Sequence, residues 1–149
     1  MEDAEPASLR KRIGAVVAII GAVLLVGAGF IVTLAARGDY TERAQASEAI
    51  ALMSGVRREL AEHFANERRW PASLEAIEAP RQGKYTHSIA VTQGAGGTGP
   101  VELTASLRTE GVRGAVAGRT IVMSSADAGK SWTCRAGTID AKYLPSSCR

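Results

Sequence analysis

The feature that most constrains this chain is an uninterrupted apolar run from Ile13 to Ala36. The run contains no charged residue, and basic residues lie directly before and after it. An α-helix needs about 20 mostly apolar residues to cross the hydrocarbon core of a bilayer, whereas a secretory signal peptide has an apolar core of roughly 7–15. The run is also too long for a typical buried helix of a small domain, which is the alternative. It therefore predicts a retained transmembrane helix.

The basic residues before the run predict its orientation. Arg10, Lys11 and Arg12 stand together at its start, and basic residues close to the end of a span favour the cytoplasmic side. Acidic residues in the same short tail count for little in this rule. We therefore expect a cytoplasmic basic tail (1–12), a transmembrane helix (13–36) and an extracytoplasmic domain (37–149).

A helical periodicity continues beyond the apolar run, to about residue 66. Apolar residues recur at spacings of three and four, which places them on one stripe of a helix. No proline separates this segment from the apolar run, so one long helix is expected. The residues of the stripe are Ala46, Ala49, Met53, Val56, Leu60 and Phe64.

The pattern changes after Trp70-Pro71, which ends the helical region because proline cannot continue a helix. A short helical turn capped by Ser73 is expected next. Alternating apolar and polar residues then predict strands at 84–92, 101–108, 120–124 and 131–134. In the first strand, Tyr85, His87, Ile89 and Val91 are expected to share a face. The fold class is thus α+β: a long helix packed on a four-stranded antiparallel sheet (84–134).

The two cysteines, Cys134 and Cys148, both lie near the C-terminus, in the part expected outside the cytoplasm. An oxidising compartment favours a disulfide between them. Closing such a loop stabilises a fold by roughly 3 kcal/mol in the chain-entropy model. A metal site would need more ligands, and the two histidines, His63 and His87, fall in different predicted elements. We expect no metal and no cofactor.

No arrangement of residues predicts an enzyme. A Ser/His/Asp set, or a pair of carboxylates that would define a cleft, is not evident in the sequence. Two glycine-bearing stretches, 94–99 and 129–131, differ from phosphate-binding loops because no helix is expected to follow either one. We expect a non-enzymatic protein without a small-molecule substrate.

The C-terminal half of the chain is basic. Residues 81–149 carry nine basic and four acidic residues, whereas residues 37–80 carry six and eight. Such an excess permits contact with nucleic acid, anionic lipid or an acidic partner, although a solvated basic surface is the simpler interpretation. The candidate residues for polyanion contact are Arg108, Arg113, Arg119 and Lys130.

Three stretches together resemble a type IV pilin. The segment 39–49 (DYTERAQASEA) resembles the region where the pilin helix leaves the membrane, and Trp70-Pro71 resembles the turn after that helix. The segment from Trp132 to Arg149 resembles the C-terminal loop of the family, which a disulfide closes. The resemblance covers residues 39–149 in the order of the family.

The resemblance implies a fold and a set of partners. The apolar helix would anchor the protein in the inner membrane as a single pass, with the outer domain in the periplasm, and would form the filament core after assembly at the cell surface. Residues 83–99 and the loop 134–148 would shape the edges that meet neighbours or surfaces. The implied partners are other pilin subunits or pilus assembly proteins, in pili that serve adhesion, motility or DNA uptake.

The N-terminus differs from the family pattern, in which a basic leader ends in glycine and the fifth residue of the mature chain is glutamate. The nearest candidate cleavage site here is Gly14 followed by Ala15, and the fifth residue after it is Ile19. Three hypotheses follow: a pilus subunit cut after Gly14, an uncleaved membrane-anchored accessory protein, and a membrane-tethered module that binds DNA or another polyanion.

Overall fold

The computed structural model describes the backbone of residues 5–149 and the side chains of residues 12–28 and 39–149. The chain divides into two compact units, Met1–Gly38 and Asp39–Arg149, and each is described by itself. One helix, α1 (Glu5–Glu67), belongs to both units. It begins eight residues before the predicted start at Ile13 and ends within one residue of the predicted end.

The first unit is entirely helical where it is described. Its apolar side chains between Ile13 and Val26 are exposed. Residues 29–36 of the predicted span lie outside the residues whose side chains are described. Within the described part of the chain, no helix has the length and apolar character required to cross a membrane.

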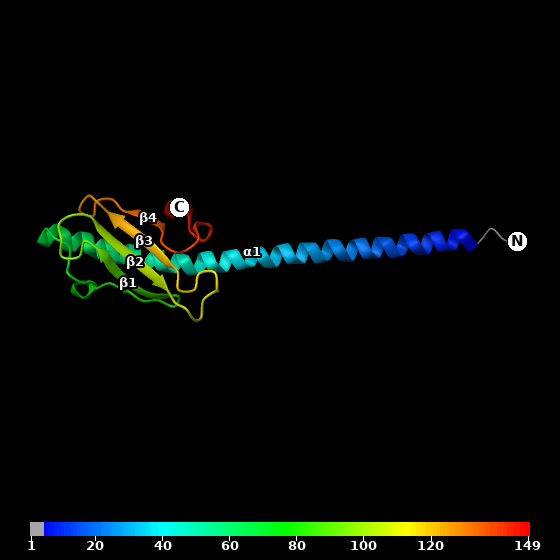
Figure 1. The fold of residues 1–149 in the computed structure, drawn as a ribbon, viewed down its shortest axis with the longest axis horizontal. Coiled ribbons are helices and arrows are strands. Elements are labelled where there is room, and N and C mark those ends of the chain that lie inside the picture. Colours follow the sequence, from blue (N-terminus) through cyan, green and yellow to red (C-terminus); the bar gives the residue numbers. More distant parts are fainter. Residues whose placement is uncertain (1–4) are drawn as a thin grey trace. The chain divides into compact units, whose positions relative to one another are not determined.

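The second unit contains a four-stranded antiparallel sheet beside α1 (Figure 1). The strands lie in chain order, so each is joined to its neighbour by a simple loop. The predicted α+β fold class is confirmed. The strands are β1 (Thr86–Gln93), β2 (Val101–Leu107), β3 (Thr120–Ser125) and β4 (Thr133–Ala136).

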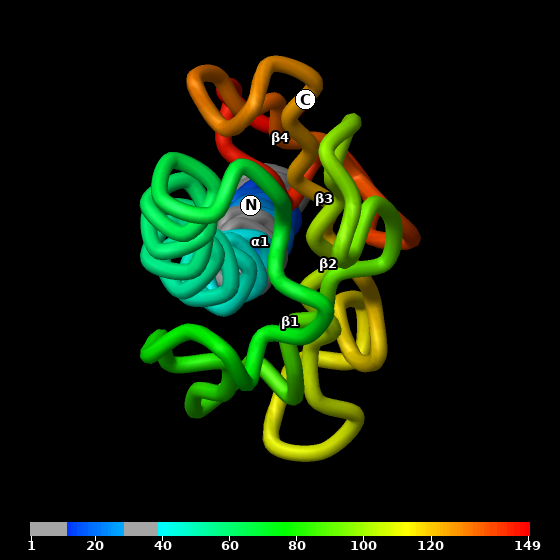
Figure 2. The backbone as a smooth tube through the Cα atoms, turned by 90° about the vertical axis from the view of Figure 1, so that its left-hand side faces the viewer, coloured from blue at the N-terminus to red at the C-terminus, as the bar shows by residue number. Residues whose placement is uncertain are grey.

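The core forms where the apolar stripe of α1 meets one face of the sheet (Figure 2). Five predicted stripe residues, from Ala46 to Leu60, are fully buried, and the sixth, Phe64, is half-buried. In β2 every second residue, from Val101 to Leu107, is buried, as the period of two predicts. The helix stripe and the apolar face of the sheet therefore remove each other from water.

The prediction that His87 lies on the same face of β1 as Ile89 is wrong. Thr86 pairs with Leu107 but Ser88 pairs with Ser106, so His87 is an extra residue in the ladder. Such a bulge reverses the alternation on one side of it. Thr86 is consequently buried and His87 is exposed.

The strand β4 begins two residues after the predicted Ser131. The cause is Asp127, whose carboxylate accepts hydrogen bonds from the backbone N–H and the hydroxyl of Ser131, at 2.9 and 2.6 Å. These bonds hold Ser131 in the loop before β4.

The connector between α1 and β1 folds onto the end of the helix. Trp70 is buried, its backbone N–H donates to Gly97 O (2.8 Å), and its indole Nε1 donates to Gly99 O (2.7 Å). Its ring packs against Phe64, with centroids 4.5 Å apart. The expected turn follows as a 3-10 helix, Leu74–Ala76, capped by Ser73.

Candidate functional site

The C-terminal loop is closed by a disulfide between Cys134 and Cys148, as predicted. Cys134 belongs to β4, and Cys148 is buried in the last 3-10 helix, Ser146–Cys148. The disulfide therefore ties the chain end to the edge strand of the sheet. An earlier 3-10 helix, Ala141–Tyr143, buries Tyr143 within the same loop.

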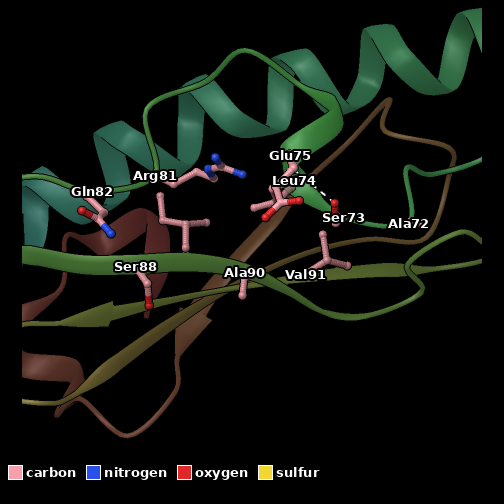
Figure 3. A pocket seen from close by; sticks show the side chains of 10 residues that line it. Ala72, Ser73, Leu74, Glu75, Arg81, Gln82, Ser88, Ala90 and Val91 are labelled. Atoms are coloured by element: carbon pink, nitrogen blue, oxygen red, sulfur yellow. Dashed lines mark hydrogen bonds between the residues drawn. The ribbon is translucent and has the colours of Figure 1, made fainter.

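A pocket of about 400 Å³ lies between the connector and the edge strand β1 (Figure 3). Residues 72–75, Arg81 and Gln82 line it from the connector, and Ser88 to Val91 line it from β1. The hydroxyl of Ser73 caps the 3-10 helix, because it accepts a hydrogen bond from the backbone N–H of Glu75. The lining of the pocket does not place a nucleophile beside a base, so the pocket is a concave surface next to the edge strand of the sheet.

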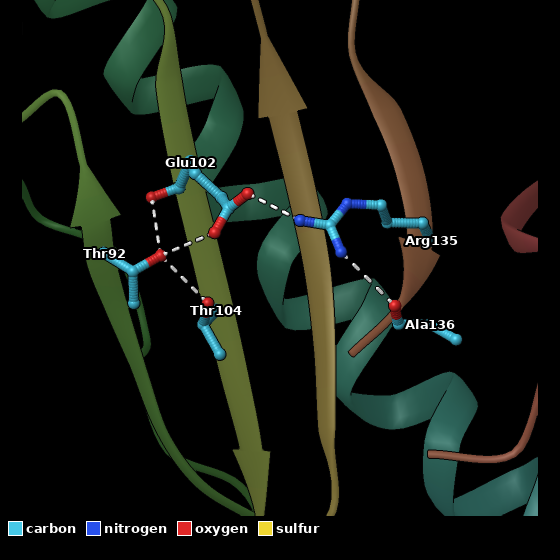
Figure 4. Close-up of polar contacts among 5 residues, drawn as sticks. All are labelled: Thr92, Glu102, Thr104, Arg135 and Ala136. Atoms are coloured by element: carbon cyan, nitrogen blue, oxygen red, sulfur yellow. Dashed lines mark hydrogen bonds and ion pairs between the residues drawn. The ribbon is translucent and has the colours of Figure 1, made fainter. Parts of the chain in front are cut away.

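The outer face of the sheet carries a polar network (Figure 4). The guanidinium of Arg135 in β4 donates to the carboxylate of Glu102 in β2, with an N–O distance of 2.7 Å. Glu102 also accepts from the hydroxyl of Thr92 (3.1 Å), which is 3.0 Å from the hydroxyl of Thr104. The network connects β1, β2 and β4, and Glu102 neutralises the charge of Arg135.

The four candidate polyanion residues do not form one cluster. Arg108, Arg113 and Arg119 lie in the loop between β2 and β3, whereas Lys130 lies in the β3–β4 loop (126–132), at the opposite end of β3. Arg108 is half-buried, and its Nε donates to Gly83 O at 3.2 Å, which is a structural contact. The sequence-predicted site is thus divided between the two ends of the sheet.

Two arginines that sequence reasoning did not select lie beside Lys130. Arg57 and Arg58, together with Lys130 and Trp132, line a cavity of about 420 Å³ between α1 and the β3–β4 loop. The signal in the sequence is the Arg57-Arg58 pair, which borders the apolar stripe at Val56. It becomes a site only when the loop, more than 65 residues away in the sequence, packs beside it.

The candidate cleavage residues, Gly14 and Ala15, lie within α1 and are exposed. A Cβ atom added at Gly14 would have no neighbour within 4 Å. Among the described residues, no three His, Cys, Asp or Glu side chains lie close enough to hold a metal ion.

This combination of a helix packed on a four-stranded sheet with a disulfide-closed chain end can be compared with known proteins. The sequence pattern of the pilin family, described as a bacterial filament protein, matches residues 42–149. The chain belongs to the pilin family. Pilins are structural, non-enzymatic proteins that are anchored in membranes and exposed on the cell surface in pili.

Individual pilins are similar over most of this chain. Fimbrial protein EcpC of Eikenella corrodens is 37% identical over 131 residues, which cover 85% of this pilin and 83% of EcpC. The type IV major pilin protein PilE1 of Neisseria gonorrhoeae is 31% identical over 153 residues, covering 85% and 68% of the two chains. A fimbrial protein of Neisseria meningitidis is 29% identical over 155 residues, which cover 85% of this pilin and 87% of the meningococcal protein. The resemblance to a type IV pilin is confirmed.

Proposed function

We propose that this pilin is a structural subunit of a type IV pilus, held in the inner membrane before assembly. The observation that carries the proposal is the apolar surface of the first unit. Nine large apolar side chains between Ile13 and Val26 are more than half exposed on α1, and the exposure reaches 77% at Leu25. Contact with lipid or with another protein stabilises an apolar surface of this kind, because each Å² of apolar surface removed from water contributes about 25 cal/mol of favourable free energy.

The proposal places this apolar surface in two successive environments, the membrane and the filament. In the membrane the surface faces lipid, with residues 1–12 in the cytoplasm and residues 37–149 in the periplasm. In the filament it faces the same helix of neighbouring subunits. Other pilins and pilus assembly proteins are then the partners, and adhesion, motility or DNA uptake is the activity that the filament serves.

We infer that the chain is processed between Gly14 and Ala15 before assembly. Cleavage removes Arg10, Lys11 and Arg12, and a mature chain that begins at Ala15 has no ionisable side chain before Arg37. The new α-amino group of Ala15 is then the charge that the helix carries into the filament core. The mass of the N-terminal peptide from membrane-extracted protein, with and without the prepilin peptidase of the host, tests this step. A chain that starts at Ala15 only when the peptidase is present supports it. An intact chain containing Glu2 to Gly14 overturns it and favours the uncleaved accessory protein.

Assembly itself is tested with a matched pair of substitutions at Leu25. Leu25→Glu places a charge on the apolar surface, and we expect the variant to be absent from filaments sheared off the cells. Leu25→Ala keeps the surface apolar and should be recovered at near wild-type amounts. Equal recovery of both variants would contradict burial of this surface in a filament. Attachment, twitching and transformation assays on a strain lacking the chain distinguish the three activities.

A further inference from the structure

A groove runs along α1 where the β3–β4 loop (126–132) lies beside the helix. It consists of two adjoining cavities, of about 420 and 290 Å³, which share Ala61, Gly129 and Lys130 as lining residues. The loop touches the helix closely between them: a Cβ atom added at Gly129 would lie 3.0 Å from the Cβ of Ala61. The groove therefore has the helix as one wall and the loop as the other.

Cationic side chains line the groove along its length. Arg57, Arg58 and Lys130 line the first cavity, and Arg68 lines the far side of the second. Arg57 lies on α1 and Arg68 directly follows the end of this helix at Glu67, and the helix from Arg57 to Glu67 spans roughly 15 Å at 1.5 Å per residue. The charges thus extend over a distance that suits a ligand with several anionic groups.

Among the described residues, Arg57, Arg68 and Lys130 form no ion pair with a carboxylate. Arg58 pairs with Glu59 at 3.5 Å, and the arginine side chain is 80% exposed. Such exposed pairs are weak and exchange readily with other anions. The acid of the loop, Asp127, directs its carboxylate to Ser125 at the end of β3 and to Ser131 in its own loop. Arg57 and Lys130 therefore have their charges available to a ligand.

The rest of the groove suits ring-shaped groups with apolar faces. The indole of Trp132 lines the first cavity and is held in place by its Nε1, which donates to Gly129 O at 3.1 Å. The second cavity is lined mainly by apolar side chains and backbone. Its apolar residues are Ala61, Phe64, Ala65 and Ala128.

We propose that this groove binds an acidic oligosaccharide. Sulfate, phosphate or carboxylate groups on the sugar match the arginines, whose guanidinium groups bind such anions through two parallel hydrogen bonds. The apolar faces of the sugar rings match Trp132 and the second cavity. A groove for single-stranded nucleic acid would present several exposed aromatic platforms to successive bases, whereas the aromatic side chains that line this groove, Trp132 and Phe64, are both half-buried. The inference is independent of whether the pilin enters a filament.

The test is calorimetric titration of the full chain, in micelles of a non-ionic detergent, with a heparin-derived tetrasaccharide. The double variant Arg57→Ala/Lys130→Ala should bind the tetrasaccharide at least about tenfold more weakly. The matched control is Arg113→Ala/Arg119→Ala, which removes the same charge at the opposite end of the sheet. It should change the affinity less than about twofold. Thermal unfolding of both variants shows that each is folded, since all four side chains are at least partly exposed.

Two further titrations identify the ligand class. The desulfated tetrasaccharide should lose most of the affinity, because the anionic groups carry the recognition. Trp132→Leu should weaken binding of the tetrasaccharide but not of inorganic sulfate. Equal weakening by the two double variants, absence of tetrasaccharide binding, or tighter binding of a ten-nucleotide oligothymidylate would each overturn the proposal. The last result would assign the groove to nucleic acid.

Discussion

The carboxylate of Glu48 accepts hydrogen bonds from both the backbone N–H and the hydroxyl of Thr86, at 3.0 and 3.2 Å. The same carboxylate accepts from the backbone N–H groups of Lys84 and Tyr85, at 2.8 and 2.7 Å. One side chain on α1 thus satisfies three successive N–H groups at the beginning of β1. Glu48 therefore fixes the end of the connector and allows Thr86 to be buried.

Replacement of Glu48 should destabilise the protein more than replacement of an exposed glutamate on the same helix. Glu48→Ala leaves three backbone N–H groups without an acceptor, and we expect a loss of about 2–3 kcal/mol in the free energy of unfolding. Urea unfolding of the detergent-solubilised chain measures it. The control is Glu62→Ala on the exposed side of α1, which should change stability by less than about 0.5 kcal/mol. Equal effects of the two variants would show that the bonds of Glu48 contribute little.

The disulfide between Cys134 and Cys148 should stabilise the C-terminal loop. It closes a loop with a sequence separation of 14, for which the chain-entropy model gives about 3 kcal/mol. Reduction should lower the free energy of unfolding by this amount and expose Tyr143 and Leu144 to hydrogen exchange. The double variant Cys134→Ser/Cys148→Ser should be insensitive to reductant. A loop that keeps its protection after reduction would contradict the prediction.

The hydrogen bond of the indole N–H of Trp70 and the packing of its ring should contribute separately to the free energy of unfolding. Trp70→Phe keeps most of the apolar area but loses the bond to Gly99 O, and we expect a cost of about 1–2 kcal/mol. Trp70→Ala also opens a cavity against Phe64 and should cost about 3–5 kcal/mol. Unfolding curves of the two variants separate these contributions. Identical losses would mean that the ring packing is less important than its burial suggests.

Gly129 should not tolerate a side chain. Its φ of +84° is unfavourable for other residues, and an added Cβ would lie 3.2 Å from the Cη2 of Trp70 and closer still to Ala61. We expect Gly129→Ala to destabilise the protein by about 1–2 kcal/mol. Gly114→Ala is the matched control, because Gly114 has open space around it. Thermal unfolding of both variants tests the difference.

The β3–β4 loop should lose order at low pH. Hydrogen bonds from the side chain and backbone of Ser131, and a further one from Ser125, lower the pKa of Asp127 from 3.8 to about 2. A depressed pKa means that the ionised form stabilises the fold, fully above pH 3.8 and progressively less as the pH falls toward 2. Amide exchange at Gly129 and Ser131 should therefore accelerate over this range. In Asp127→Asn the exchange should be fast already at neutral pH, and an unchanged rate in this variant would contradict the role of the carboxylate.

The sequence predicts several components of the candidate site, namely the connector turn at Trp70 and the cysteine pair, and its composition shows the excess of basic residues. The sequence does not predict how the basic residues are grouped in space. Lys130 and Arg108 both belong to the basic half of the sequence, yet the antiparallel course of β3 carries them to opposite ends of the sheet. Sequence composition records charge but not the distance between two loops.

The sequence by itself determined the elements of this pilin. The helical stripe from Ala46 to Leu60 and the alternation in β2 are local periodicities, and burial follows from them once a core exists. The tertiary structure alone decided the bulge at His87, the contact of Glu48 with Thr86, and the groove at Arg57 and Lys130. Each of these depends on atoms from segments far apart in the chain. Their positions are set by packing across the whole domain, which no local pattern encodes.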